Sequence, residues 1–526
     1  MTGSIDCTVV IPVFNRGEAL TAGIDSLRAQ TLGEGRVEII YVDDGSDDGR
    51  TPKLIDQVVA NTPNARVFHE PASGSPGRPR NVGLANAQGD YVFFADHDDW
   101  FDQEALERLV GFARENSSDV VIGKVVAYGR RAVIPRIFRE SRARIPAAEA
   151  MISLTPHKLF RREFLLQHGI RAPEGKRRLE DHEFVTHAYL HAQTISVYAD
   201  RICYHHNHPG DDGNFSQSPV DIEVYTRSNR DVIALICRHT DGDPERRDAM
   251  LQRPVVHELL KKAGPRRMRP ADAEGEALKH HVLRTALVED VPDTVIDRMA
   301  AFPRATAKAL RDDDPEAVRR IDDRSAALSL RAELVDLRAN GSTWTIDYRI
   351  GLERDGELVR FEPGPGRETW WLDEPTLARG DADRAERQDE LLAVDVEILV
   401  ACRRTSEQWH LRGTSNVRLS ETRSGGILRR RGDAETLQIT GNATIDLADV
   451  GGAQIGFGVW DVLVRAEVLG VALKTRLGVI DESALPSPLP RQSLRNPKAH
   501  AAAFVTEAKR LLAVEVGRRR GDRGSA

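Results

Sequence analysis

The stretch Tyr91-Val92-Phe93-Phe94-Ala95-Asp96-His97-Asp98-Asp99-Trp100 joins an apolar run to three carboxylates within four residues. The apolar run predicts a buried strand of a parallel sheet, and the acids then lie at the open end of that sheet, where ligands of α/β folds bind. Carboxylates this close repel one another unless a cation lies among them, and their hard oxygen atoms suit Mg²⁺ or Mn²⁺. The stretch therefore predicts a metal ion bound together with a nucleotide diphosphate. An acidic turn that caps the next helix is the alternative interpretation.

The residues before this stretch alternate between short apolar runs and segments with helical spacing. The predicted strands cover residues 7–13, 37–42 and 65–69, and the predicted helices cover 18–30, 52–60 and 80–87. This alternation predicts a Rossmann-like α/β domain with a parallel sheet. The second strand also ends in acids, Asp43 and Asp44, so we expect two acidic clusters at one edge of the sheet. A carboxylate there can accept a hydrogen bond from a base N–H or a ribose hydroxyl.

Composition and charge narrow the function classes. The chain has 526 residues, of which 29% are charged, and a formal net charge of −7, which argues against a nucleic-acid-binding protein. The four cysteines lie far apart, so we expect neither a zinc site nor a disulfide framework. The N-terminus shows no signal peptide, and we expect a cytoplasmic protein. The basic tail 517–520 could touch the anionic inner face of a membrane.

Two further segments carry candidate binding and catalytic residues. In the glycine-rich segment 73–81, small residues let the backbone approach a ligand, while Arg78 and Arg80 offer guanidinium groups that suit phosphate. Glu180 and Asp181 come just before a predicted helix at 184–190, so we expect the helix N-terminus to favour their ionised forms. An ionised carboxylate in a sugar pocket is a candidate general base. A helix N-cap is the alternative.

Five motifs in this order resemble the family 2 glycosyltransferases of the GT-A fold. They are Val-Val-Ile-Pro-Val-Phe-Asn-Arg (9–16), Val-Asp-Asp-Gly-Ser-Asp-Asp-Gly (42–49), Gly-Arg-Pro-Arg-Asn-Val-Gly-Leu-Ala (77–85), Gly-Asp-Tyr-Val-Phe-Phe-Ala-Asp-His-Asp-Asp-Trp (89–100) and Leu-Glu-Asp-His (179–182). The glycine-rich segment, Leu-Glu-Asp-His and the loop 204–216 are similar to the wall teichoic acid subgroup. The resemblance covers roughly the first 220 residues.

The resemblance implies roles for residues on the donor side of the site. Asp96 and Asp98 are expected to hold the metal ion, with Asp96 also close to the ribose of the donor. His97, between them, is expected to point away. The other expected donor contacts are Pro12 and Phe14 beside the uracil base, and Asp44, Arg78, Arg80, His208 and Ser216.

On the acceptor side, the resemblance implies that Asp181 takes the proton from the attacking hydroxyl and that Glu180 beside it binds the acceptor or the sugar. The expected reaction is an inverting, metal-dependent transfer of a hexose or N-acetylhexosamine from a UDP-sugar to a hydroxyl of a teichoic-acid-like cell-envelope glycopolymer. One alternative is a sugar nucleotidyltransferase, whose G-x-G signature would stand where residues 12–16 read Pro-Val-Phe-Asn-Arg. The other is a non-catalytic glycan-binding or scaffold protein.

The remaining residues predict three further regions after the catalytic domain (1–221). They are a helical linker (222–330), an antiparallel, Ig-like β-sandwich (331–485), and a C-terminal helix with a basic tail (486–526). The tryptophans of the β region are interpreted as core anchors in preference to a sugar-stacking surface: Trp344, Trp370, Trp371, Trp409 and Trp460. The subgroup resemblance implies that this β domain forms homo-oligomers, often trimers.

Overall fold

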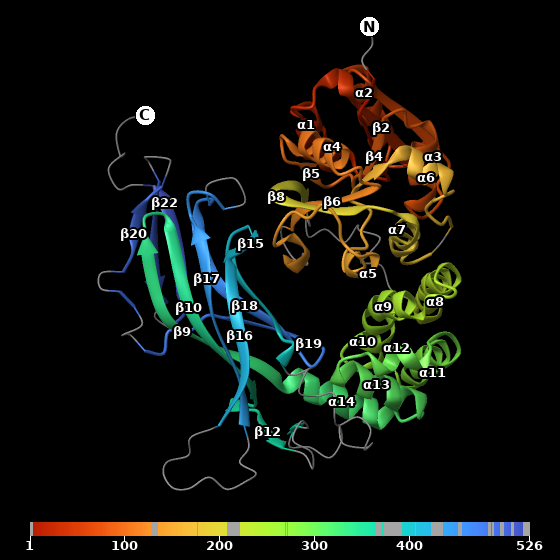
Figure 1. Ribbon diagram of the computed structural model, residues 1–526. Coiled ribbons are helices and arrows are strands. Elements are labelled where there is room, and N and C mark those ends of the chain that lie inside the picture. The colour runs from red at the N-terminus through yellow and green to blue at the C-terminus, as the bar shows by residue number, and fades with distance from the viewer. Residues whose placement is uncertain are drawn as a thin grey trace, which may run out of the picture. The chain divides into compact units, whose positions relative to one another are not determined.

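The computed structural model describes most of the chain (Figure 1). The described residues are 4–127, 135–175, 177–207, 221–268, 270, 272–363, 370–372, 392–405, 407–421, 435–450, 455–481, 485–486, 489–494, 499–506 and 510–518. The chain divides into two compact units, residues 1–262 with 270–295 and residues 263–269 with 296–526.

The first unit is built on an eight-stranded sheet. Its strands, in spatial order, are β3 (Ala65–Glu70), β2 (Val37–Asp44), β1 (Cys7–Val13), β4 (Tyr91–Phe94), β7 (Leu159–Arg161), β6 (Val120–Ala127), β8 (Ile195–His206) and β5 (Trp100–Phe101). The first four run parallel, as predicted, whereas β7 runs antiparallel to both of its neighbours. Because β1, β2 and β4 are parallel, the acids that follow β2 and β4 emerge at the same edge of the sheet.

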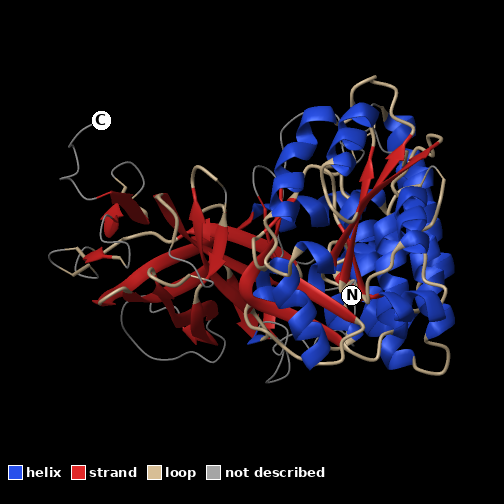
Figure 2. Cartoon of the chain, turned by 90° about the horizontal axis from the view of Figure 1, so that it is seen from above, coloured by secondary structure: helices blue, strands red, loops and turns tan. Residues whose placement is uncertain are grey.

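Helices cover both faces of this sheet (Figure 2). The main helices are α1 (Thr21–Arg28), α2 (Thr51–Ala60), α3 (Gly77–Asn86), α4 (Ala105–Glu115), α6 (Arg162–Gln167) and α7 (Glu180–His191), with short elements η1 (Gly17–Leu20), η2 (Glu34–Arg36), η3 (Pro135–Phe138) and α5 (Ala147–Ala150). Alternate residues of β1 face opposite sides: Val9 and Ile11 join the core that includes α1 and α4, while Val10 faces α3. At Gly83 of α3, an added Cβ would lie 2.2 Å from Val10 Cγ1, so glycine permits this close packing.

The region after residue 221 is helical, as predicted. It contains α8 (Ile222–His239), α9 (Pro244–Val255), η5 (Val256–Leu260), α10 (Lys261–Ala263), α11 (Ala273–Asp290), α12 (Asp293–Asp297), α13 (Ala301–Arg311) and α14 (Pro315–Ala327). Aspartates cap several of these helices; Asp221, for example, accepts hydrogen bonds from two amides of the first turn of α8. Among the residues that the structure describes, no helix has the length and apolar character needed to cross a bilayer.

Two antiparallel sheets follow, which confirms the predicted antiparallel β fold. One holds β9 (Leu328–Asn340), β10 (Thr343–Arg354), β11 (Glu357–Leu358), β12 (Arg360–Pro363), β13 (Trp370–Leu372), β16 (Arg412–Glu421) and β17 (Glu435–Asp446). The other holds β14 (Asp395–Cys402), β15 (Gln408–His410), β18 (Gly458–Val468), β19 (Val471–Arg476), β20 (Arg491–Ser493), β21 (Ala499–Val505) and β22 (Leu512–Arg518). Trp344, Trp409 and Trp460 are buried, as expected of core anchors, whereas the side chains of Trp370 and Trp371 lie outside the described part of the chain.

The predicted C-terminal helix is wrong. The last described segments form β21 and β22, which pair with each other, and β22 also pairs with β18, where Val514 lies opposite Trp460. Val514 and Val516 are buried while Glu515 between them is exposed, a period of two that suits a strand. The alanines at 501–503 favour a helix locally, but pairing with distant strands outweighs that preference.

Candidate active site

Three carboxylates gather just beyond the end of β4. One oxygen from each of Asp96, Asp98 and Asp99 lies within 4.8 Å of the others. Asp98 and Asp99 are buried, and Asp96 is half-buried. Three oxygen donors at this spacing fit Mg²⁺ or Mn²⁺, which prefer carboxylates and water. The geometry is consistent with the predicted metal site.

Distant segments hold Asp96 in place. Its backbone N–H donates to the Tyr204 hydroxyl at 2.9 Å, and its Oδ2 atom lies 3.2 Å from Nε2 of His157. Tyr204 is fully buried on β8, and its ring stacks on that of His157 at 5.0 Å between centroids. The sequence motifs assigned neither residue a role.

Nitrogen ligands lie next to the acids. His206 Nε2 is 2.5 Å from His157 Nδ1, and ligand atoms of Asp99, His157 and His206 also lie within 4.8 Å of one another. The backbone N–H of Asn207 donates to Asp99 Oδ1 at 2.8 Å. The segment 204–206 was predicted to be a flexible loop, but it is the end of β8. The predicted donor contacts His208 and Ser216 lie outside the described residues.

Arg80 links the acid cluster to the Glu180-Asp181 pair. Its Nη2 atom is 3.5 Å from Asp96 Oδ1, and its Nη1 atom is 3.5 Å from Glu180 Oε1. The Arg80 side chain is buried and enters from the first turns of α3, which begins at Gly77, earlier than predicted. The structure therefore brings Arg80, Asp96 and Glu180 together.

Glu180 and Asp181 begin α7, within the first turn instead of before the helix. Leu179 precedes them in the left-handed region with a φ of 57°, an uncommon conformation for a residue with a side chain. Such strain tends to occur where a structure positions functional groups. The Asp181 carboxylate accepts a hydrogen bond from the backbone N–H of His182 at 2.8 Å.

Burial shifts the pKa values of two groups near Asp181, Glu180 and Lys158. It raises the pKa of Glu180 to about 7, with a further increase from the Asp181 charge and an opposing effect of Arg80. Burial also lowers the pKa of Lys158 to about 7, against the opposing charge of Asp181. Loss of hydration thus opposes the expected influence of the helix N-terminus, so Glu180 is ionised in only part of the molecules at neutral pH.

The predicted donor-binding residues around β2 are engaged in local contacts. Asp44 accepts hydrogen bonds from the backbone N–H and the hydroxyl of Ser73, at 3.0 and 2.9 Å. Arg78 pairs with Glu70 at 2.7 Å. Pro12 is buried within β1, and Phe14 just beyond it is 49% exposed. Of these four, Phe14 alone offers a large open apolar surface to a ligand.

Comparison with known protein families identifies the class of this domain. Residues 8–168 match the family described as Glycosyl transferase family 2, and residues 222–322 match the Glycosyl transferase TarS linker domain. The chain thus carries a family 2 glycosyltransferase domain followed by a TarS-type linker domain. This match favours glycosyl transfer over the nucleotidyl-transfer alternative.

Similar proteins point to a particular group within this class. A poly(ribitol-phosphate) β-glucosyltransferase of Bacillus spizizenii is 34% identical over 232 residues, which are 44% of this chain and 36% of that protein. Poly(ribitol-phosphate) β-N-acetylglucosaminyltransferase TarS of Staphylococcus aureus is 33% identical over 201 residues, 38% of this chain and 35% of that protein. The matches span about a third of the length of these relatives. The crystal structure of S. aureus TarS matches 98% of this chain and 86% of its own, with a TM-score of 0.56 at 17% identity, so the fold is shared along the chain.

Proposed function

We propose that this chain transfers a hexose or N-acetylhexosamine from a UDP-sugar to a hydroxyl of an anionic cell-envelope polymer of the poly(ribitol phosphate) kind, with inversion at the anomeric carbon. The observation that carries the proposal is the position of Arg80, 3.5 Å from both Asp96 and Glu180, which brings the acid cluster and the acid pair to one site. The named relatives act on poly(ribitol phosphate), and residues 1–349 of S. aureus TarS have been crystallised with UDP-GlcNAc.

On the donor side, Asp96 and Asp98 would hold Mg²⁺ or Mn²⁺ on the diphosphate. When bound, such an ion neutralises the negative charge that develops on the leaving UDP. His157 and Tyr204 keep Asp96 in position through the contacts described above. Arg80 supplies a fixed positive charge between Asp96 and Glu180, and Phe14 offers an open face on which the base can stack.

On the acceptor side, Asp181 accepts the proton of the attacking hydroxyl as that oxygen bonds to the anomeric carbon and the bond to UDP breaks. Attack from the face opposite UDP inverts the configuration. Because its pKa is raised to about 7, Glu180 carries a proton in part of the molecules at neutral pH and can then donate a hydrogen bond to a sugar hydroxyl. The two neighbouring acids therefore take different roles.

Three predictions about the setting of the enzyme stay open to test. They are assembly into homo-oligomers through the C-terminal β region, peripheral contact of the basic tail with membranes, and a cytoplasmic location. Light scattering of the full chain and of a variant that ends before residue 331 tests the first. Sedimentation with anionic vesicles tests the second, and cell fractionation tests the third.

The proposed reaction is tested by incubating the chain with UDP-glucose or UDP-GlcNAc, Mn²⁺ and poly(ribitol phosphate), with UDP release and labelled polymer as readouts. We expect sugar on the polymer and no product when Mn²⁺ is chelated. Asp181→Asn should lose transfer, while Asp200→Asn, an exposed aspartate on β8, should retain it. Pyrophosphate release from UTP and a sugar phosphate would instead indicate nucleotidyl transfer. Glycan binding with no release of UDP would indicate a binding protein.

A further inference from the structure

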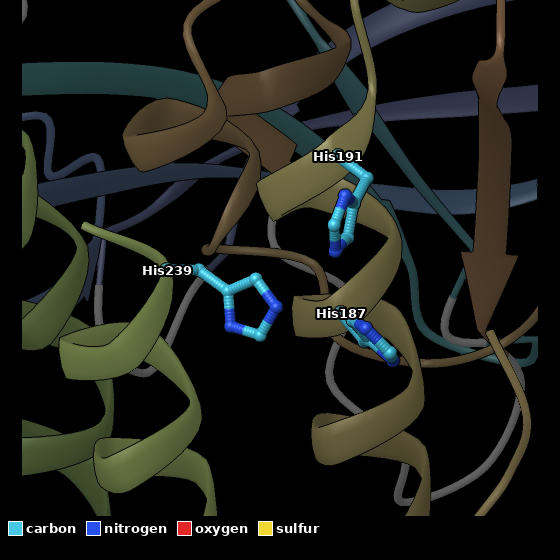
Figure 3. Close-up of side chains that lie close together, drawn as sticks. All are labelled: His187, His191 and His239. Carbon is cyan, nitrogen blue, oxygen red and sulfur yellow. The ribbon is translucent and has the colours of Figure 1, made fainter. Parts of the chain in front are cut away.

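Three histidines lie together near the C-terminal ends of α7 and α8 (Figure 3). His187 and His191 are four residues apart on α7, so both point to the same side of that helix. His239 is the last residue of α8 and faces them from the neighbouring helix. The ring centroids of each pair are 4.9 to 5.5 Å apart. Both helices belong to the first compact unit.

The spacing of the ring nitrogens suits a metal ion. One nitrogen from each ring lies within 4.8 Å of the others. A tetrahedral zinc site with bonds of about 2.0–2.1 Å places its ligand atoms about 3.4 Å apart, a distance that small side-chain rotations reach. A fourth imidazole, His168, stands beside the cluster, with its ring centroid 4.6 Å from that of His191.

The protonation of the cluster also suits a metal. Nδ1 of His239 lies 2.9 Å from the backbone oxygen of Leu235, which can only accept, so in the neutral ring Nδ1 carries the hydrogen and Nε2 is the nitrogen that can bind a metal. Neutral imidazole is the form that binds metals.

The cluster is separate from the proposed active site. Asp181 stands at the first turn of α7, and the six residues from there to His187 span about 9 Å along the helix axis. Its ligand type also differs, because imidazoles favour Zn²⁺, Ni²⁺ or Cu²⁺, whereas the carboxylates beyond β4 favour Mg²⁺ or Mn²⁺. Arg238 and Arg246 place positive charge near the rings, which weakens but does not abolish affinity for a cation.

We propose that His187, His191 and His239 bind one divalent transition-metal ion of the Zn²⁺ class, which fastens the end of α7 to the end of α8. α7 carries the Glu180-Asp181 pair at its other end, and α8 is the first helix of the region that matches the TarS linker domain. The ion therefore joins the catalytic domain to its linker. Exposed His239 gives the ion a route in from solvent.

The test is zinc binding by the untagged full chain, measured by calorimetry and thermal unfolding at neutral pH, with excess Mg²⁺ present to occupy the carboxylates. We expect the wild-type chain to bind zinc and to melt at a higher temperature with it. His239→Gln should weaken this binding at least tenfold. The double variant His187→Gln/His191→Gln should bind one equivalent of zinc fewer than the wild-type chain.

Two control variants distinguish this cluster from other histidines. His281→Gln changes an exposed histidine on α11, and His157→Gln removes the imidazole beside Asp96. Both should keep the zinc equivalent assigned to the cluster. If the double variant fails to fold, the zinc affinity of His239→Gln decides the test. This variant should fold normally, because the His239 side chain is exposed at the end of a helix. Wild-type failure to bind zinc, or unchanged binding in His239→Gln, would overturn the proposal.

Discussion

The two strands on either side of β1, β2 and β4, both end in aspartates at the same edge of the sheet, yet the two ends are built differently. At β2, Asp43 contacts His69 and the amide of Ser46, and Asp44 holds the backbone and hydroxyl of Ser73. At β4, Asp96, Asp98 and Asp99 lie within 4.8 Å of one another. The same local pattern thus stabilises a loop in one case and concentrates negative charge in the other. The surroundings of a carboxylate decide its role.

The largest effect is expected from Asp98→Ala. Loss of this proposed metal ligand should lower transfer at least about 10³-fold, since stabilisation of the leaving group by a bound ion is worth several kcal/mol. Asp43→Asn, at the end of β2, should lower transfer less than tenfold. Rates of UDP release measure both, with circular dichroism as the check on folding. Equal losses of transfer rate in Asp98→Ala and Asp43→Asn would show that the two strand ends do not differ in function.

Asp181→Asn should lower transfer about 10²- to 10³-fold, the contribution expected of a general base. Its affinity for the UDP-sugar should stay close to that of the wild-type chain, because the role proposed for Asp181 is on the acceptor side. Glu183→Gln is the matched control, since Glu183 lies in the same helical turn but pairs with Arg177 at 2.6 Å. A large loss of donor affinity in Asp181→Asn would assign that residue to the donor side instead.

Glu180 should make stability depend on pH. Its pKa rises from 4.5 to about 7 on folding, so the folded chain keeps this proton over a pH range in which the unfolded chain loses it. The resulting stabilisation is present below pH 4.5 and is lost as pH rises through 7. Relative to Glu180→Gln, the wild-type chain should lose up to roughly 3 kcal/mol of unfolding free energy between pH 4.5 and 8. Urea unfolding at a series of pH values measures this difference. The same pH dependence of the unfolding free energy in the wild-type chain and in Glu180→Gln would contradict the prediction.

Asp44→Ala should have the smallest effect, a loss of about 1 kcal/mol in unfolding free energy, because Ser73 loses its hydrogen-bond acceptor. The segment that Ser73 begins leads into α3 and Arg80, so the KM for the UDP-sugar should rise while kcat changes little. Ser73→Ala removes one of the two hydrogen bonds and should shift KM less. A kcat loss as large as that of Asp98→Ala would place Asp44 among the residues that contact the reacting groups.

The sequence predicts the fold well where the pattern is local. Apolar runs locate β1, β2 and β4, and the acids after them locate the edge of the sheet that carries the site. It misses His157 and Tyr204, because their contacts with Asp96 join residues more than 60 positions apart. It also fails at β21 and β22, where pairing with β18 outweighs the helical preference of alanine.

The pKa of Glu180 is another property that depends on contacts between residues far apart in the chain. Its place at a helix N-terminus is readable from the sequence and predicts an ionised acid. Its burial beside Asp181, which opposes ionisation, depends on how α3, α7 and the end of β4 pack together. Properties set by the neighbours of a residue along the chain are predictable, and those set by tertiary packing are not.

Metal-dependent glycosyl transfer with Asp181 as the base is measured by the transfer of labelled sugar from UDP-GlcNAc or UDP-glucose to poly(ribitol phosphate). The wild-type chain and Asp181→Asn are each assayed with Mn²⁺ and with a chelator. Labelled polymer is expected only from the wild-type chain in the presence of Mn²⁺. Labelled polymer from Asp181→Asn at the wild-type rate, or undiminished transfer in the chelator, would contradict this expectation.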